Sequence, residues 1–328
     1  MSPSVPADLT VADVAEALAA QGYLADAGLA TSIFLALVLR RPLLLEGEAG
    51  VGKTEVAKVL AAWTGGELLR LQCYEGIDVS QAVYEWDYAR QLLHLRATES
   101  AAGPGDVAAP GSGAGAAATG PGGGAAAARA SERENELYSE RFLIRRAILS
   151  AIDHGEGPPP VLLIDEVDRA DDEFEAFLLE VLSDYAVTIP ELGTLRAVVP
   201  PVVIVTSNRT RDVHDALKRR CLYHWVAHPD FEREVAIVRR RAPQASERLA
   251  TQVAAAVEAV RGMHLYKTPG VAETIDWTAA LAALGRTEID EESLDLTLGT
   301  VLKYQEDQAR VRDEGVGALV RAAVRRGA

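Results

Sequence analysis

The chain has 328 residues, enough for one large or two medium domains, and its 48% apolar and 25% charged residues are ordinary for a soluble globular protein. Asp and Glu outnumber Lys and Arg by 48 to 33, and this formal net charge of −15 argues against nucleic acid as the main partner. Cys73 and Cys221 lack a metal-site spacing, the chain start lacks a signal-peptide pattern, and no apolar run is long enough for a bilayer, so we expect a cytoplasmic protein with no membrane span.

The first elements predict an α/β domain. After a flexible tail at residues 1–10, helical spacing over 11–20 and 29–39 leads into a buried strand, RPLLLE, at 41–46. A second strand is expected at 67–72. Together with further apolar strands downstream, these elements predict a parallel sheet flanked by helices.

A glycine-rich loop follows the first strand and precedes a helix that begins near Lys53. Its sequence, GEAGVGKT, meets the pattern G-x-x-x-x-G-K-[ST]. Glycines let the backbone converge on an anion, the lysine places a cation near the β- and γ-phosphates, and the Thr54 hydroxyl can hold Mg²⁺. We therefore expect a nucleotide-binding loop made of Gly47, Glu48, Ala49, Gly50, Val51, Gly52, Lys53, Thr54 and Glu55.

Residues 97–133 form an insert rich in Ala, Gly, Pro, Ser and Thr. Such a composition cannot bury enough apolar area to offset the entropy of ordering, so we expect the insert to be disordered. The elements expected after it are a helix (134–152), a strand (161–164), a helix (172–185), a hairpin (187–199) and a strand (201–206).

The last third of the chain has helical spacing throughout. The helices expected there are 230–241, 246–262, 271–284 and 291–310. We therefore divide the chain into an α/β core at 11–228, a small all-α lid at 229–312 and a C-terminal helical tail at 313–328.

Polar side chains follow two of the apolar strands, at the sheet edge where ligands bind in parallel sheets. Asp165, after VLLI, is suited to hold Mg²⁺ through water, and Glu166 to polarise an attacking water. Asn208, after VVIVTS, either orients that water and the γ-phosphate or simply forms a turn. Arg219 and Arg220 end a short helix, where they either cap its C-terminus or act as an arginine finger in a neighbour's site.

In this order the motifs resemble those of the AAA+ ATPases. The segments GEAGVGKTEVAK, LLIDEVDRA and VTSNRTRDVHDALKRRCLYHW are most similar to the MoxR branch, over about residues 20–305. Within that branch the chain looks like the subgroup linked to von Willebrand factor A partners and to maturation of carbon monoxide dehydrogenase-like enzymes. The resemblance implies a P-loop AAA+ core with a helical lid, ATP and Mg²⁺ as cofactors, and a homo-oligomer, in a hexameric ring, that works as a chaperone on a protein client, often a metalloenzyme.

The resemblance also implies roles for residues that match the family's motifs. The loop from Gly47 to Thr54 matches the Walker A motif and Asp165–Glu166 the Walker B motif. The catalytic candidates are then Glu166, Lys53, Asn208 as sensor 1, Arg220 as the finger and Arg219 as the next choice, while Thr54 and Asp165 would hold the metal.

One family feature is missing. The family's sensor 2 arginine is expected at the start of a lid helix, but the sequence there is KTPGVAETIDW, with Glu273 and no arginine. Lys267 or Arg261 would be the substitutes.

The segment 74–96 lies where the family carries an insert that faces client or pore. Its aromatic residues Tyr84, Trp86 and Tyr88 are spaced so that a strand would place them on one face. They either contact the client or pack on the core.

Three other functions share part of these motifs. A DNA-directed AAA+ motor or clamp loader would need a basic binding surface, against which the net charge argues. A P-loop metabolic kinase would not need Glu166, Asn208 and an arginine finger. A GTPase would carry an Asn-Lys-x-Asp signature, which the sequence lacks, so ATP is the expected nucleotide.

Overall fold

The structure is a computed structural model that describes residues 8–101 and 136–326. Residues 1–7 of the expected tail and 102–133 of the expected disordered insert lie outside the described residues, whereas residues 97–101 are the end of a helix. In the described part of the chain, no helix is both long and apolar enough to span a membrane.

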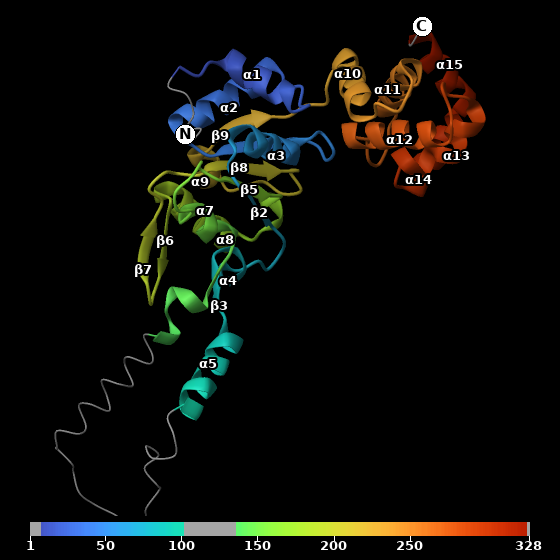
Figure 1. Cartoon of the computed structure of the whole chain (residues 1–328). Coiled ribbons are helices and arrows are strands. Elements are labelled where there is room, and N and C mark those ends of the chain that lie inside the picture. Colours follow the sequence, from blue (N-terminus) through green and yellow to red (C-terminus); the bar gives the residue numbers. More distant parts are fainter. Residues whose placement is uncertain (1–7, 102–135, 327–328) are drawn as a thin grey trace, which may run out of the picture.

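Five parallel strands form the central sheet, in the order β2-β5-β8-β1-β9 (Figure 1). Their bounds are β1 Leu43–Glu46, β2 Leu68–Gln72, β5 Val161–Asp165, β8 Val202–Ser207 and β9 Leu222–Trp225. The sequence did not predict β9. As an edge strand it leaves Tyr223 and Trp225 exposed, so it lacks the apolar run that marks a buried strand.

Helices cover both faces of the sheet. On one face lie α1 Val11–Ala20, α2 Ala27–Leu39 and α3 Lys53–Thr64, and on the other lie α7 Ala147–Ile152, α8 Asp172–Asp184 and α9 Asp215–Arg220. Leu43 and Leu45 of β1 pack with the first set and Leu44 with the second, as the alternation of a strand requires. The predicted α/β core with its flanked parallel sheet is thus confirmed.

Two small antiparallel sheets lie beside this core. The hairpin of β6 Ala186–Ile189 and β7 Gly193–Arg196 was predicted. The other pairs β3 Tyr84–Trp86 with β4 Leu143–Arg145, next to α4 Val79–Ala82, α5 Tyr88–Ala101 and the short helix η1 Glu140–Phe142.

That second pairing corrects two expectations. The single helix expected over 134–152 is wrong, because Leu143–Arg145 pairs with β3 and the buried Phe142 precedes it. The aromatic residues do not share one strand either: Trp86 is buried against Tyr138, while Tyr88 begins α5 and is 64% exposed.

The helical lid follows the α/β core, as predicted. Its helices are α10 Phe231–Arg241, α11 Glu247–Arg261, α12 Val271–Ala283, α13 Glu291–Val301, α14 Gln305–Glu314 and α15 Val316–Arg326. They bury a separate apolar cluster around Trp277, whose Nε1 donates to Thr297 Oγ1 at 2.7 Å.

Two details of the lid differ from the sequence reading. The helix expected over 291–310 is two helices, because Leu302 leaves the helical conformation and is buried in the lid cluster. Helix α15 packs on α11 in the same cluster, although it lies beyond residue 312, where we drew the end of the lid.

Candidate active site

The loop between β1 and α3 has the backbone that its glycines allow. Gly50 and Gly52 have φ angles of +80° and +94°, in the left-handed region that residues with a Cβ rarely adopt. Gly52 is also the N-cap of α3 and offers no side chain to cap it. Because an uncapped helix start presents free N–H groups, this loop fits a phosphate group.

Lys53 points into this loop. It is 6% exposed, and its Nζ donates to the carbonyl oxygens of Gly47 at 2.8 Å and Glu48 at 2.7 Å. Burial lowers the pKa of its amine, and nearby carboxylates, Asp168 first, act in the opposite direction. The loop therefore holds an amine at the place where phosphates would enter.

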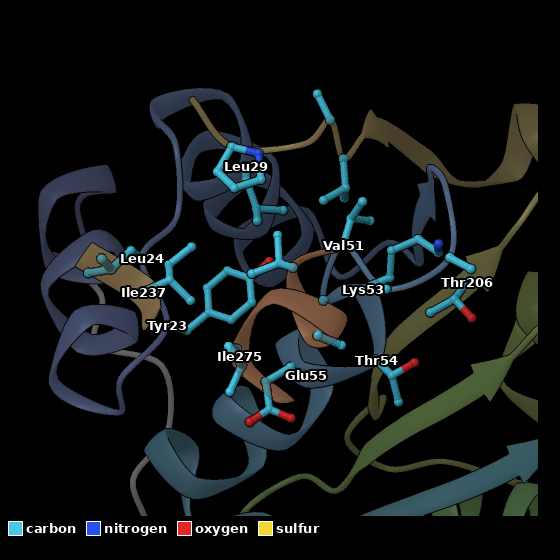
Figure 2. A pocket seen from close by; sticks show the side chains of 18 of the residues that line it. Tyr23, Leu24, Leu29, Val51, Lys53, Thr54, Glu55, Thr206, Ile237 and Ile275 are labelled. Atoms are coloured by element: carbon cyan, nitrogen blue, oxygen red, sulfur yellow. The ribbon is translucent and has the colours of Figure 1, made fainter. Parts of the chain in front are cut away.

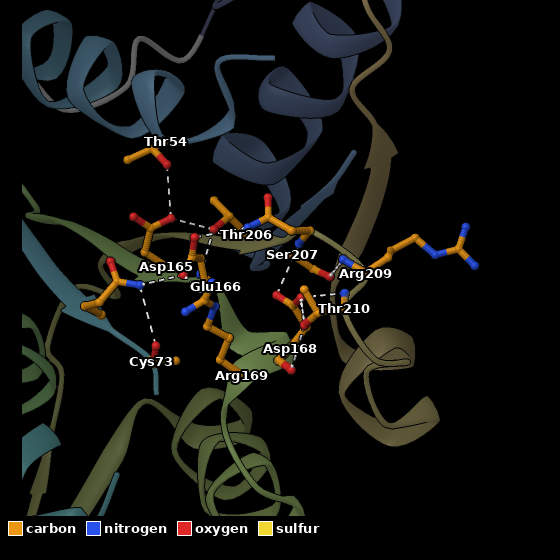
Figure 3. A network of polar contacts seen from close by, with 12 residues as sticks. Thr54, Cys73, Asp165, Glu166, Asp168, Arg169, Thr206, Ser207, Arg209 and Thr210 are labelled. Carbon is orange, nitrogen blue, oxygen red and sulfur yellow. Dashed lines mark hydrogen bonds and ion pairs between the residues drawn. The ribbon is translucent and has the colours of Figure 1, made fainter. Parts of the chain in front are cut away.

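Asp165, at the end of β5, lies beside Thr54 (Figure 3). It is 3% exposed, and its Oδ1 accepts from Thr54 Oγ1 at 3.0 Å and from Thr206 Oγ1 at 2.6 Å. Its Oδ2 accepts from Arg70, which lies on β2. A hydroxyl and a carboxylate side by side are the oxygen ligands that Mg²⁺ takes, so these two predicted metal ligands fit that ion.

Glu166 and Asn208, predicted from two different strands, are in contact. Asn208 Nδ2 donates to Glu166 Oε1 at 3.1 Å. The second oxygen of Glu166 accepts from Gln72 at 3.1 Å and pairs with Arg169 at 3.0 Å. Glu166 also has a φ of +55°, and such strained residues are concentrated at functional sites.

Asp168 holds the loop that carries Asn208 in place. It is 2% exposed, and it accepts from the backbone N–H of Asn208 at 3.1 Å and from the N–H and hydroxyl of Thr210 at 2.8 and 2.6 Å (Figure 3). The sequence analysis missed Asp168, Arg70, Gln72 and Thr206. For Arg70 and Gln72 the available signal was their spacing, since polar residues at i and i+2 of a strand share one face.

A cavity of about 370 Å³ joins these residues to the lid. One end is lined by most of the predicted loop and by the predicted polar residues: Ala49, Gly50, Val51, Gly52, Lys53, Thr54, Asp165, Glu166 and Asn208; Glu55 also lines the cavity. At the other end lie Tyr23, Leu24, Ile237 and Ile275 (Figure 2). Burial raises the pKa of Tyr23 far above its usual value, and the aromatic and aliphatic side chains at this end suit a flat base.

The lid contacts the phosphate loop directly. The N–H of Ala272, in the first turn of α12, donates to the carbonyl of Gly50 at 3.2 Å. On α10, Arg241 pairs at 3.1 Å with Glu55, in the first turn of α3 directly after the loop. A movement of the lid would therefore break or strain these contacts with the phosphate loop and the start of α3.

Glu48 links the loop to the connection between core and lid. Its Oε2 lies 3.1 Å from His228 Nε2 and accepts from Thr268 Oγ1 at 2.8 Å. These two hydrogen bonds, that of His228 first, lower the pKa of the Glu48 carboxyl.

The structure separates the two candidate finger residues. The guanidinium of Arg220 donates to the carbonyls of Leu182, at 3.4 Å, and Ser183, in the last turn of α8. Arg219 is exposed and, within the described residues, its side chain makes no hydrogen bond or ion pair. Arg41 holds this corner by donating to the carbonyls of Arg219 at 2.9 Å and Arg220 at 2.8 Å. Neither candidate is among the residues that line the cavity of its own chain.

The two suggested substitutes for sensor 2 also lie away from the cavity lining. Arg261 donates to both carboxylate oxygens of Glu234 inside the lid, and Lys267 is exposed. Glu273, at the sensor 2 position, accepts from the N–H of Gly270 and caps α12.

Several solved structures resemble this one. A proline-to-glycine mutant of RuvB from Thermotoga maritima is 15% identical and covers 94% of this chain and 76% of its own, with a TM-score of 0.43. An alanine-to-serine mutant of the same protein is 15% identical and covers 86% and 69%, with a TM-score of 0.45. A third structure, the RuvB Holliday junction branch migration motor of that organism, is 16% identical and covers 88% and 65%, with a TM-score of 0.39. No curated protein matches the chain.

The sequence also matches the model of a protein family, the AAA domain (dynein-related subfamily), over residues 42–221. The match takes in more than half of the chain, including the phosphate loop, the Asp165–Glu166 pair, Asn208 and both candidate arginines. AAA domains bind and hydrolyse nucleotides and commonly assemble into rings. The chain belongs to the dynein-related subfamily of AAA domains.

Proposed function

We propose that this chain is an ATP-hydrolysing AAA+ chaperone whose core, residues 11–228, holds the nucleotide and whose lid, residues 229–326, closes over it. One observation carries the proposal: side chains from separate elements meet at the carboxyl edge of the sheet, beside one cavity, and they are Lys53, Thr54, Asp165, Glu166 and Asn208.

Each of these residues has a role that its position supports. Lys53 would contact the β- and γ-phosphates, and Thr54 and Asp165 would hold Mg²⁺, which neutralises charge on the transferred phosphoryl group. Glu166, oriented by Asn208, would take the proton of the attacking water. The apolar end of the cavity would take the adenine base.

The Glu166→Gln variant tests this assignment. It keeps the shape of the side chain and one acceptor oxygen for Asn208 but removes the base, so ATP hydrolysis should fall by about 10²–10⁴-fold while ATP still binds. Glu180→Gln, at an exposed position of α8, is the matched control and should hydrolyse ATP normally. Near wild-type turnover of Glu166→Gln would move the role to another residue.

We further propose that the site is shared between subunits of a homo-oligomer, a hexameric ring, with Arg219 as the finger. Its exposed guanidinium supports this choice, whereas that of Arg220 is engaged at the end of α8. Arg219→Ala should bind ATP, keep its melting temperature and hydrolyse about 10³–10⁵-fold more slowly. Arg220→Ala should instead lower the melting temperature, because it removes donors from two helix-terminal carbonyls.

Mixing variants makes this test sharper. A Lys53→Ala subunit has a defective loop and an intact finger, and an Arg219→Ala subunit has the reverse, so mixed rings should regain part of the activity. If mixed rings form without activity, the shared site is refuted. If Arg220→Ala folds and is inactive while Arg219→Ala is active, the finger is Arg220.

For the partners, we propose a von Willebrand factor A-domain protein and a metalloenzyme client in the cytoplasm, with no nucleic acid. This rests on the resemblance of the motifs and on the exposed side chains of α5, the helix that extends away from the sheet (Figure 1). Those side chains are Tyr88, Leu92 and Leu93, exposed by 64%, 50% and 66%.

The Glu166→Gln variant, held in its ATP-bound state, would serve as bait for these partners. It should capture a von Willebrand factor A-domain protein together with a metalloenzyme, and Leu93→Glu should weaken that capture. Lys53→Ala is the control and should capture neither. If neither partner is captured and DNA stimulates hydrolysis instead, the DNA-directed motor is the better reading.

A further inference from the structure

Arg70 contacts the carboxylate that is expected to serve the metal. It lies on β2, the edge strand that pairs with β5, and its Nε and Nη2 donate to Asp165 Oδ2 at 3.1 and 2.6 Å. The side chain of Arg70 is 54% exposed and that of Asp165 only 4%. A guanidinium therefore reaches from the solvent side onto a buried acid.

In this arrangement the acceptor capacity of Asp165 is used up. A carboxylate has about four lone-pair sites, two on each oxygen. Thr54 and Thr206 donate to Oδ1, and the two N–H groups of Arg70 donate to Oδ2. A metal-bound water that is to donate to Asp165 must therefore replace one of these donors.

Of these donors, Arg70 is the one that can leave most easily. Thr206 is 1% exposed, and its hydroxyl also accepts from the N–H of Glu166 at 2.9 Å. Thr54 can keep donating to Asp165 while its oxygen lone pair faces a metal, because a hydroxyl is donor and acceptor at once. Arg70 is exposed, whereas Thr54 is half-buried and Thr206 is buried.

Arg70 also has a second anchor that keeps it near. Its Nη2 donates to Gln72 Oε1 at 2.6 Å, two residues along the same strand and on the same face. The guanidinium can therefore release Asp165 and remain within reach of it.

We propose that Arg70 is an internal counter-ion of Asp165 that competes with Mg²⁺ and so sets the metal affinity of the nucleotide site. The inference rests on the proposed nucleotide site. In this role Arg70 lowers the affinity of the site for Mg²⁺: with Arg70 present, the metal binds more weakly. An arginine that only orients Asp165 for the metal would instead make the metal bind more tightly.

The sign can be measured without any hydrolysis. Isothermal titration calorimetry gives the Kd of ADP for the full chain in EDTA and in saturating Mg²⁺. The Kd in EDTA divided by the Kd in Mg²⁺ reports how strongly the metal supports ADP binding. For Arg70→Ala this ratio should rise by about tenfold, at the lower end of what a charge-assisted hydrogen bond contributes. Arg70→Lys keeps the charge but loses the bidentate contact, so its ratio should lie between those of the wild type and Arg70→Ala.

Arg169→Ala is the matched control. It also removes one positive charge beside the acidic pair, but Arg169 pairs with Glu166, and its own side chain is 56% exposed. Its ratio should change by less than about threefold, since a solvent-exposed charge acts weakly at a distance. Melting curves of all variants show that each is folded.

Each result decides the question. An unchanged or lower ratio in both Arg70 variants overturns the inference, and so does an equal rise in Arg169→Ala, which would indicate a general charge effect. If neither the wild type nor Arg70→Ala binds ADP more tightly with Mg²⁺ than without it, the inference fails while the nucleotide site stands. If the wild type does not bind ADP at all, the proposed site itself fails.

Discussion

Replacing Arg261 by alanine separates a structural role for this arginine from a role in sensing the nucleotide. Its side chain is 13% exposed and donates to both oxygens of Glu234 at 2.5 and 2.8 Å, and its Nε donates to the carbonyl of Pro269 at 2.7 Å. Glu234, on α10, is 1% exposed and also accepts from Thr274 on α12 at 2.7 Å. Arg261 thus ties together three helices of the lid.

The expected loss of stability is large. Arg261→Ala leaves the Glu234 carboxylate buried without its counter-charge, and breaking such a pair costs about 3–5 kcal/mol. In a domain of about 100 residues each kcal/mol lowers the melting temperature by about 4–8 °C, so the lid should melt more than about 10 °C earlier. Adding Glu234→Gln should recover part of this loss, because the stranded charge is then removed.

Urea unfolding, followed by tryptophan fluorescence and circular dichroism, measures the effect. Trp277 is fully buried in the lid and serves as its reporter. The control is Arg248→Ala on the same helix, since its pair with Glu288 is exposed by 62% and 51% and should contribute only about 0–1 kcal/mol.

Two results would refute this reasoning. If Arg261→Ala costs no more stability than Arg248→Ala, the buried pair does not hold the lid together. If Arg261→Ala keeps its stability but no longer hydrolyses ATP, Arg261 acts on the nucleotide after all.

Four further predictions concern single residues or segments. Lys53→Ala should weaken ATP binding by about 1.5–3 kcal/mol, the contribution of a hydrogen bond to a charged group, and unchanged affinity in calorimetry would contradict the assignment. Burial raises the pKa of Cys73 and of Cys221 to about 12, so both thiols should react at pH 8 far more slowly in the folded protein than in urea, where the pKa is about 8.5; equal rates would argue against their burial. Burial lowers the pKa of His224, so the unfolded chain binds a proton at this residue more readily than the folded chain does. The free energy of unfolding should therefore fall as the pH drops below about 6.5, and it should fall less in His224→Gln. Midpoints of urea unfolding measured across that pH range would show this difference. Because residues 101–128 lack large apolar side chains, a short Gly-Ser linker in their place should leave the melting temperature unchanged, and a collapsed melting temperature would contradict the predicted disorder.

The sequence alone was enough for those parts of the site that depend on neighbouring residues. The phosphate loop is one uninterrupted pattern, and Asp165 and Glu166 directly follow an apolar strand. Because parallel strands end at the same edge of a sheet, the positions of Glu166 and Asn208 after two strands placed both at that edge, and the pairing of β5 with β8 then brings them into contact. The helices of the lid could be predicted as well, because the spacing of apolar residues along a helix can be seen within a single segment.

Only the tertiary structure decided what depends on residues far apart in the chain. Residues 143–145 form a strand rather than part of a helix because β3 supplies their hydrogen-bond partners, and β9 is a strand because β1 lies beside it. The apolar spacing of one segment cannot reveal a partner strand. Pairing with a distant strand therefore determined the structure of residues 143–145 against their helical spacing.

The same reason explains the side chains that the sequence left undecided. Arg220 binds carbonyls of α8, Arg261 binds Glu234 across the lid, and Arg70 reaches Asp165, 95 residues further along the chain. An arginine in a sequence shows a charge and a length but not its acceptor, because the acceptor is brought to it only when distant elements pack. What these arginines do is therefore a property of the fold, whereas the presence of the nucleotide loop was already a property of the sequence.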